Sequence, residues 1–169
     1  IAEFTAVYEK FGGVVGEKAK YLAAVTRISI DRTAAVQELE GLSKSSSDVG
    51  KLAKFALAQT KAGDGKYDEA VALYQELLGM SDPIVARDTI SFELAGLYEK
   101  QGKKQEAVDT LFGIVKTASE AKDLDGKAVP LSSTAMSAKD KLSELDPEKA
   151  KEIPEQAPDP SGGGMPFGL

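Results

Sequence analysis

The sequence of 169 residues contains no cysteine, histidine, tryptophan or asparagine. Without cysteine the chain forms no disulfide and has no thiolate for nucleophilic or metal chemistry. Without histidine it lacks the side chain that proteins use most often as a general base and as a metal ligand. We therefore expect a protein that is not an enzyme, with no catalytic residue, no metal site and no cofactor.

Aromatic residues are also scarce, at 7% of the chain, so a core has to be built mainly from Ala, Leu, Val and Ile. No run of about 18 apolar residues occurs, and we expect no membrane insertion of this segment. The net charge is −6 and the isoelectric point is about 4.8. Because phosphate contacts by basic side chains supply most of the affinity for nucleic acids, the acidic composition argues against a nucleic-acid partner.

The chain opens at Ile1 without Met and without the basic, apolar and small-residue regions of a signal peptide. We expect it to be a piece of a longer protein, and the sequence leaves open whether a membrane anchor or a leader precedes it.

Three segments of the sequence repeat one pattern, in which an Ala-Val pair follows a Leu-Ala pair with its alanine 12 residues later. The pairs are Leu22-Ala23 with Ala35-Val36, Leu57-Ala58 with Ala70-Val71, and Leu94-Ala95 with Ala107-Val108. The repeats are spaced by 35 and then 37 residues. Two antiparallel helices approach closely only where side chains are small, so the pattern predicts helical hairpins that cross at the paired alanines.

Turn and cap signals separate the expected helices. Gly65 and Gly102 stand at the turn of the second and third repeats, whereas Ile30 makes the first repeat degenerate. Carboxylates that can cap free backbone N–H groups predict helix starts at Asp31, at Asp48 and at Asp82-Pro83.

These residues resemble the tetratricopeptide repeat (TPR) family, which places Leu and a small residue in its first helix, Gly at the turn and Ala in its second helix. The family's Trp is absent, and Lys61 replaces the first-helix aromatic that Tyr98 provides in the third repeat. The resemblance implies an all-α fold, an α-solenoid of about three TPR-like hairpins with a partial N-terminal helix and a C-terminal capping helix. The expected segments are 1–13 (second helix of a truncated repeat), 16–49 (degenerate repeat), 51–84 and 88–121 (repeats), 132–146 (capping helix) and 153–169 (Pro/Gly-rich tail).

The C-terminal third contains further expectations. Residues 116–131 are predicted to be a loop, and the capping helix is expected to bury Met136, Leu142 and Leu145 and to stop at Asp146-Pro147. If the tail is ordered, burial of Met165 and Phe167 has to offset its entropy. We expect it either to dock on an apolar surface near Phe55 and Phe92, of the same or a neighbouring molecule, or to make only a lattice contact.

One motif in the predicted loop suggests a metal site. Asp123-x-Asp125-Gly126 matches part of a calcium-binding loop, but the first and twelfth ligand positions would be Ala121 and Ser132. We interpret the motif as a polar turn.

In a TPR array the first helices of successive repeats line the concave face. Carried onto this sequence, the resemblance implies binding candidates at Lys20, Tyr21, Arg27, Phe55, Gln59, Phe92 and Glu93, with Ala24, Leu52, Thr89 and Gly96 beside them. Phe55 and Phe92 occupy equivalent positions, and either core packing or contact with a ligand explains them.

The expected partner is a protein or a peptide, and two functions remain open. The degenerate Ala- and Leu-rich repeats and the closing Leu-Asp-Pro helix over residues 16–146 look like the TPR-like domain of ancillary Sec-translocon subunits. That resemblance implies a non-catalytic interaction scaffold, an accessory subunit of a bacterial cell-envelope complex on the periplasmic side. The alternative is a chaperone-like module that binds peptides or substrates in an open apolar groove, with a cytoplasmic location as the alternative place.

Overall fold

A computed structural model describes residues 1–154, so the predicted tail from residue 155 onward, with Met165 and Phe167, lies outside the described residues. The described residues are helical, and their only β-type pairing is an isolated bridge between Lys122 and Ala128. The predicted all-α fold class is therefore confirmed. The chain divides into two compact units, Ile1–Lys103 and Lys104–Leu169.

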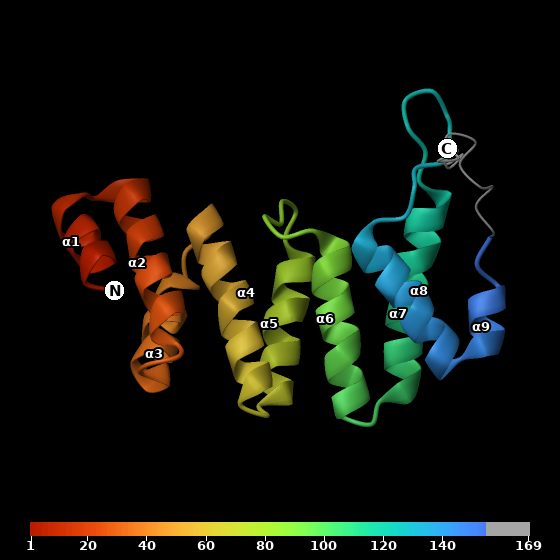
Figure 1. Ribbon diagram of the computed structural model, residues 1–169, viewed down its shortest axis with the longest axis horizontal. Helices are drawn as coiled ribbons and strands as arrows, with labels where there is room; N and C mark the ends of the chain where they lie inside the picture. The colour runs from red at the N-terminus through yellow and green to blue at the C-terminus, as the bar shows by residue number, and fades with distance from the viewer. Residues whose placement is uncertain (155–169) are drawn as a thin grey trace, which may run out of the picture. The chain divides into compact units, whose positions relative to one another are not determined.

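Six helices build the first unit, and each packs against the next one along the chain. They are α1 (Ala2–Lys10), α2 (Gly13–Arg27), α3 (Arg32–Leu42), α4 (Asp48–Gly63), α5 (Tyr67–Gly79) and α6 (Arg87–Lys100). Figure 1 shows them side by side in chain order, and α2 also contacts α4. Helices α2 with α3 and α4 with α5 correspond to the first two expected repeats.

The second unit contains α7 (Lys104–Glu120), α8 (Ser133–Leu145) and the short α9 (Pro147–Lys151). Helix α8 packs on α7, and α9 contacts both of them. The expected third repeat, 88–121, spans the division between the units, because α6 belongs to the first and α7 to the second. The repeat boundaries therefore stay a prediction.

Local signals in the sequence place several helix ends correctly. The Asp31 carboxylate accepts a hydrogen bond from the backbone N–H of Ala34 at 3.0 Å and caps α3. Gly65 and Gly102 have φ values of 74° and 73°, a left-handed conformation that glycine adopts without a steric penalty. The chain can therefore reverse tightly after α4 and after α6.

The predicted start at Asp48 is confirmed, although the residue that caps α4 is Ser47, one position earlier. The predicted start at Asp82-Pro83 is wrong, because helix α6 starts at Arg87. The Arg87 guanidinium donates hydrogen bonds to the carbonyl groups of Leu78 and Met80 near the end of α5. A start signal was thus present at Asp82-Pro83, but tertiary contacts selected another residue.

The C-terminal expectations also need correction. Helix α7 continues to Glu120, so the loop starts five residues later than predicted, because the buried Ile114 and Val115 keep this end of the helix packed. Leu142 is buried as predicted, but Met136 is 51% exposed and Leu145 is only half-buried. Helix α8 also buries Ala135 and Ala138. These small side chains allow α8 to lie close to α7.

Asp146 ends α8 as predicted, but it also starts another helix. Its carboxylate accepts a hydrogen bond from the backbone N–H of Lys149 at 2.9 Å, and Pro147 occupies the first position of α9. Proline suits this position because its missing N–H would have no partner there. The same two residues can therefore both stop and restart a helix.

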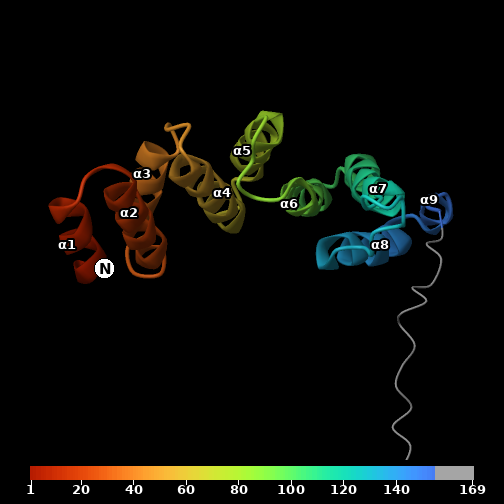
Figure 2. The ribbon, with the colours of Figure 1, turned by 90° about the horizontal axis from the view of Figure 1, so that it is seen from above.

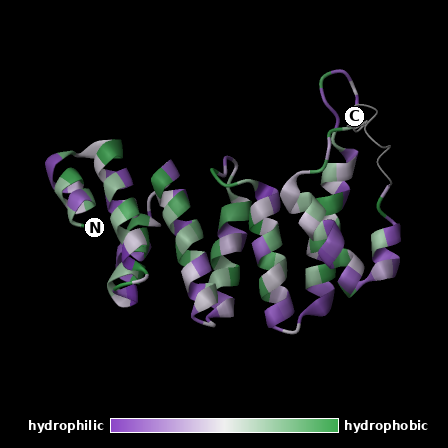
Figure 3. Cartoon of the chain, in the orientation of Figure 1, coloured by the Kyte–Doolittle hydropathy of each residue, from purple (hydrophilic) through white to green (hydrophobic). Residues whose placement is uncertain are grey.

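The interior of the first unit has two clusters of buried residues that meet at α4. The N-terminal cluster comprises Ala24, Leu39, Ala53, Ala56 and Leu57. The central cluster comprises Ala58, Ala70, Tyr74, Leu77, Ile90, Leu94 and Leu97. Figure 3 shows the corresponding alternation of hydrophobic and hydrophilic residues along α4 to α6. The expected alanine pair of the second repeat, Ala58 with Ala70, is fully buried in the central cluster.

Lys61 is the one charged residue with a buried position in residues 1–154, and two helices provide its partners. Its side chain is 9% exposed. The ammonium group lies 3.0 Å from Glu40 Oε1 of α3 and 2.9 Å from Glu69 Oε2 of α5. A buried ammonium requires paired charges of this kind, so Lys61 ties α4 to the helices on both sides of it.

None of the helices in residues 1–154 has both the length and the hydropathy that a membrane crossing requires.

The alanine crossing predicts a difference between two alanines of α5. Ala70→Leu should destabilise the chain by about 1–3 kcal/mol, because the extra volume forces α4 and α5 apart. Ala72→Leu is the matched control, since Ala72 is exposed on the same helix. Urea unfolding measures both, and equal midpoints for the two variants would contradict the assigned crossing.

The Lys61 cluster predicts how stability depends on pH. The hydrogen bond from Lys61 lowers the pKa of Glu69 from its ordinary value of 4.5. A lowered pKa in the folded state stabilises the fold above about pH 4.5, and this contribution is lost as the pH falls through the folded pKa. Hydrogen bonds to Glu69 and Glu40 raise the pKa of Lys61 from 10.5, so its contribution persists up to that pH and is lost only above it.

Lys61→Met should therefore flatten the loss of stability on acidification, because Glu69 no longer has a cation to pair with. Lys44→Met removes an exposed charge and is the control. Urea midpoints measured from pH 3 to pH 7 (about the window that brackets the carboxylate pKa) compare the variants. A slope as steep in Lys61→Met as in the wild type would show that the cluster does not govern this dependence.

Candidate binding surface

Helix α4 has one open stripe, and three of the predicted binding positions lie on it. Eight of its residues are buried and cover the rest of its circumference. Leu52, Phe55 and Gln59 recur at helical spacing on the remaining side, where Leu52 and Phe55 are half-buried and Gln59 is exposed. Packing of α4 against its neighbours thus leaves only this stripe for contact with another molecule.

Helix α6 presents the corresponding side chains. Ile90, Leu94 and Leu97 face the central cluster. Phe92 and Glu93 are half-buried on the other side of the helix, as are Thr89 and Gly96. Figure 2 shows that α4 and α6 lie on the same side of α5. The first helices of two expected repeats therefore lie on one side of α5.

A hydrogen bond joins the two helices. Gln59 Nε2 of α4 donates to Glu93 Oε1 of α6 at 3.4 Å. The four residues Phe55, Gln59, Phe92 and Glu93, two on each helix, are called the α4–α6 surface below. The structure thus connects predicted site residues that lie 34 residues apart in the sequence.

Tyr74 of α5 lies beneath this surface. Its ring centroid is 5.7 Å from that of Phe55, and the rings are tilted by 59°, an arrangement that aromatic pairs favour. The residue is fully buried, and its hydroxyl group forms no hydrogen bond with any of residues 1–154. Burial raises the pKa of Tyr74, and the negative charge of Glu93 raises it further. The hydroxyl is therefore neutral and keeps its proton for donation.

Core packing and contact with a ligand, the two interpretations of Phe55, apply to different sides of its ring. Phe55 packs against the central cluster, which accounts for its buried side. Its half-buried position leaves the remainder of the ring at the α4–α6 surface. An aromatic ring that is held by the core on one side can offer a rigid contact on the other, because fixing it on binding costs little further entropy.

The three candidates on α2, Lys20, Tyr21 and Arg27, each make contacts within the first unit. Tyr21 packs against the N-terminal cluster, and burial raises its pKa. Ala24, beside it, is fully buried. Arg27 forms an ion pair with Glu38 of α3, with Nη1 and Oε1 3.3 Å apart. The structure thus uses Tyr21 and Arg27 to pack α2 against the neighbouring helices.

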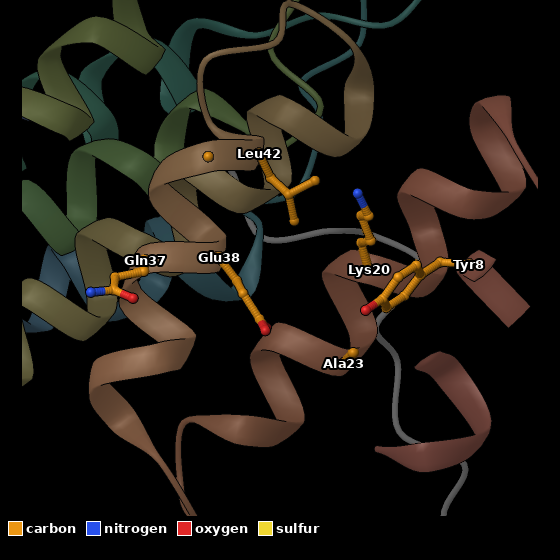
Figure 4. A pocket seen from close by; sticks show the side chains of 7 residues that line it. Tyr8, Lys20, Ala23, Gln37, Glu38 and Leu42 are labelled. Carbon is orange, nitrogen blue, oxygen red and sulfur yellow. The ribbon is translucent and has the colours of Figure 1, made fainter. Parts of the chain in front are cut away.

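Lys20 lies at a pocket of about 380 Å³ between α1, α2 and α3. The lining residues are Tyr8, Lys20, Ala23, Gln37, Glu38, Gly41 and Leu42. Figure 4 shows Tyr8 and Lys20 on one side of the pocket and Glu38 and Leu42 on the other. The Lys20 ammonium is 5.2 Å from the centroid of the Tyr8 ring. Lys20 therefore lies at a different site from the α4–α6 surface.

The loop after α7 uses its aspartates for local structure. The Asp123 carboxylate accepts hydrogen bonds from the backbone N–H groups of Asp125 and Lys127, at 2.9 and 2.8 Å. Gly126 completes the turn with a φ of 76°. The interpretation of this motif as a polar turn agrees with these bonds. Within residues 1–154, no group of three or more acidic side chains gathers as a metal site would require.

Sequence reasoning missed Tyr74 as a member of the site. Tyr74 follows Ala70 by one helical turn, where the other repeats have Leu39 and Leu111, so the pattern indicates a packing position between the helices of a pair. The only signal was the hydroxyl group at a position that is otherwise leucine, since a buried hydroxyl requires a partner.

Comparisons with protein-family models, with curated proteins and with solved structures find no match to this chain.

The position of Tyr74 predicts an unusual response to loss of its hydroxyl group. Tyr74→Phe should not destabilise the chain, and should stabilise it by up to about 1–3 kcal/mol, because a buried hydroxyl without a hydrogen bond opposes folding. Tyr67→Phe, on a half-buried residue of the same helix, should change stability little. A thermal midpoint of Tyr74→Phe below that of the wild type would show that the hydroxyl is satisfied in solution.

Proposed function

We propose that this chain is a non-catalytic scaffold that binds another protein, or a peptide segment of one, at the α4–α6 surface. One observation supports this most directly. Helices α4 and α6 each present a half-buried phenylalanine, and a hydrogen bond between Gln59 and Glu93 joins the two helices. Aromatic residues contribute much of the binding free energy of most protein interfaces. A rigid helical support keeps the conformation of the surface nearly the same before and after binding, which lowers the entropy cost of association.

The wider assignment rests on the sequence pattern. We propose that the helix pairs are TPR-like repeats, and that the chain is an accessory subunit of a bacterial cell-envelope complex on its periplasmic side. The resemblance over residues 16–146 supports that placement, and the sequential packing of helices in each unit agrees with a helical repeat. The α4–α6 surface has the position that a TPR-type array uses for its ligand.

The test is selection of short random peptides, displayed on phage, against the full chain. Phe55→Ala and Phe92→Ala should each weaken the selected peptides by about tenfold, which corresponds to loss of a typical interface anchor. Phe112→Ala is the matched control, because Phe112 is a half-buried phenylalanine of the second unit. Circular dichroism checks that every variant remains helical.

Three outcomes separate the alternatives. Enrichment of a defined peptide pattern that both surface variants weaken supports the scaffold. Binding of many unrelated peptides with similar affinity would favour the chaperone-like module instead. Peptides that bind Phe55→Ala and Phe92→Ala as well as the wild type, or no enrichment at all, would reject the α4–α6 surface as the binding site.

A further inference from the structure

Glu93 is a carboxylate on the α4–α6 surface to which the described residues offer no cation. It is half-buried, accepts the 3.4 Å hydrogen bond from Gln59, and forms no ion pair within residues 1–154. A partly desolvated carboxylate whose only hydrogen-bond partner is an amide is stabilised most by a cation that a binding partner supplies.

The lysines of α4 are engaged elsewhere. Lys51 pairs with Asp48 at 3.4 Å, and Lys54 pairs with Glu76 of α5 at 2.5 Å. Lys61 lies between Glu40 and Glu69. Rearrangement of α4 to supply a cation to Glu93 would therefore break an existing pair, and the local charge favours a basic ligand over an acidic one.

The groups next to Glu93 suit the remainder of such a ligand. The half-buried ring of Phe55 offers an apolar face, which also attracts cations through its π-electrons. Tyr74, fully buried and in contact with Phe55, supports this ring from within the core.

We propose that the α4–α6 surface recognises a polypeptide segment that carries an arginine or lysine next to an apolar residue. Glu93 pairs with the basic side chain, Gln59 holds the carboxylate in place, and Phe55 takes the apolar residue. This inference rests on the proposed function, because it assigns the partner chemistry of the same surface.

The experiment compares peptides selected by the wild-type chain with those selected by two variants at Glu93. The wild type should enrich Arg or Lys beside an apolar residue, and its affinity for those peptides should fall as ionic strength rises. Glu93→Gln keeps the acceptor for Gln59 and removes the charge, so it should bind the same peptides about tenfold more weakly. Glu93→Lys should enrich acidic peptides instead.

Glu9→Gln is the control for net charge, because Glu9 is exposed on α1. It should leave the peptide pattern and the affinity unchanged.

The outcomes distinguish this inference from the proposed function. Peptides without a basic residue that still depend on Phe55 would overturn the assignment of Glu93 and leave the scaffold standing. A basic pattern that persists with equal affinity in Glu93→Gln would also overturn it. Peptides that ignore both Phe55 and Glu93 would reject the binding surface itself.

Discussion

Close packing around α4 is the constraint on which the rest of the first unit depends. This helix contributes Ala53, Ala56 and Leu57 to the N-terminal cluster and Ala58 to the central cluster. Small side chains at these positions let neighbouring helices approach, and the short distances in turn bury almost the whole circumference of α4. The open stripe with Phe55 and Gln59 is what remains. The candidate surface is thus a consequence of the core rather than an addition to it.

Charged side chains have two different uses near the C-terminal end of α4. Lys61 is buried and pairs with two carboxylates from the adjacent helices, which makes it a connection between them. Glu93 of α6 is held only by the amide of Gln59, two residues before Lys61. A buried charge with its partners present stabilises a fold, whereas a half-buried charge without them favours association with a molecule that brings the counter-charge.

Much of the local structure followed from short sequence signals. The small-residue repeat indicated helices crossing at Ala58 and Ala70, and the single glycines at Gly65 and Gly102 indicated where the chain turns. Such features depend on a few neighbouring residues, so they can be read directly. The start of α6 could not, because Asp82-Pro83 is an adequate cap and Arg87 is held by carbonyl groups of the preceding helix. Competing caps differ by less free energy than one tertiary contact contributes.

The sequence by itself determined that the chain is all-helical and that its core is rich in alanine, whereas the resemblance to TPR proteins suggested Phe55, Gln59, Phe92 and Glu93 as candidates for one face. Helical periodicity and side-chain size are properties of the linear chain, and they specify which side of each helix is apolar. Only the tertiary structure decided that Gln59 reaches Glu93 and that Tyr21 and Arg27 contact the neighbouring helices. It also decided that the Tyr74 hydroxyl lies buried below Phe55. These outcomes depend on distances between helices, which arise from the packing of every side chain at once.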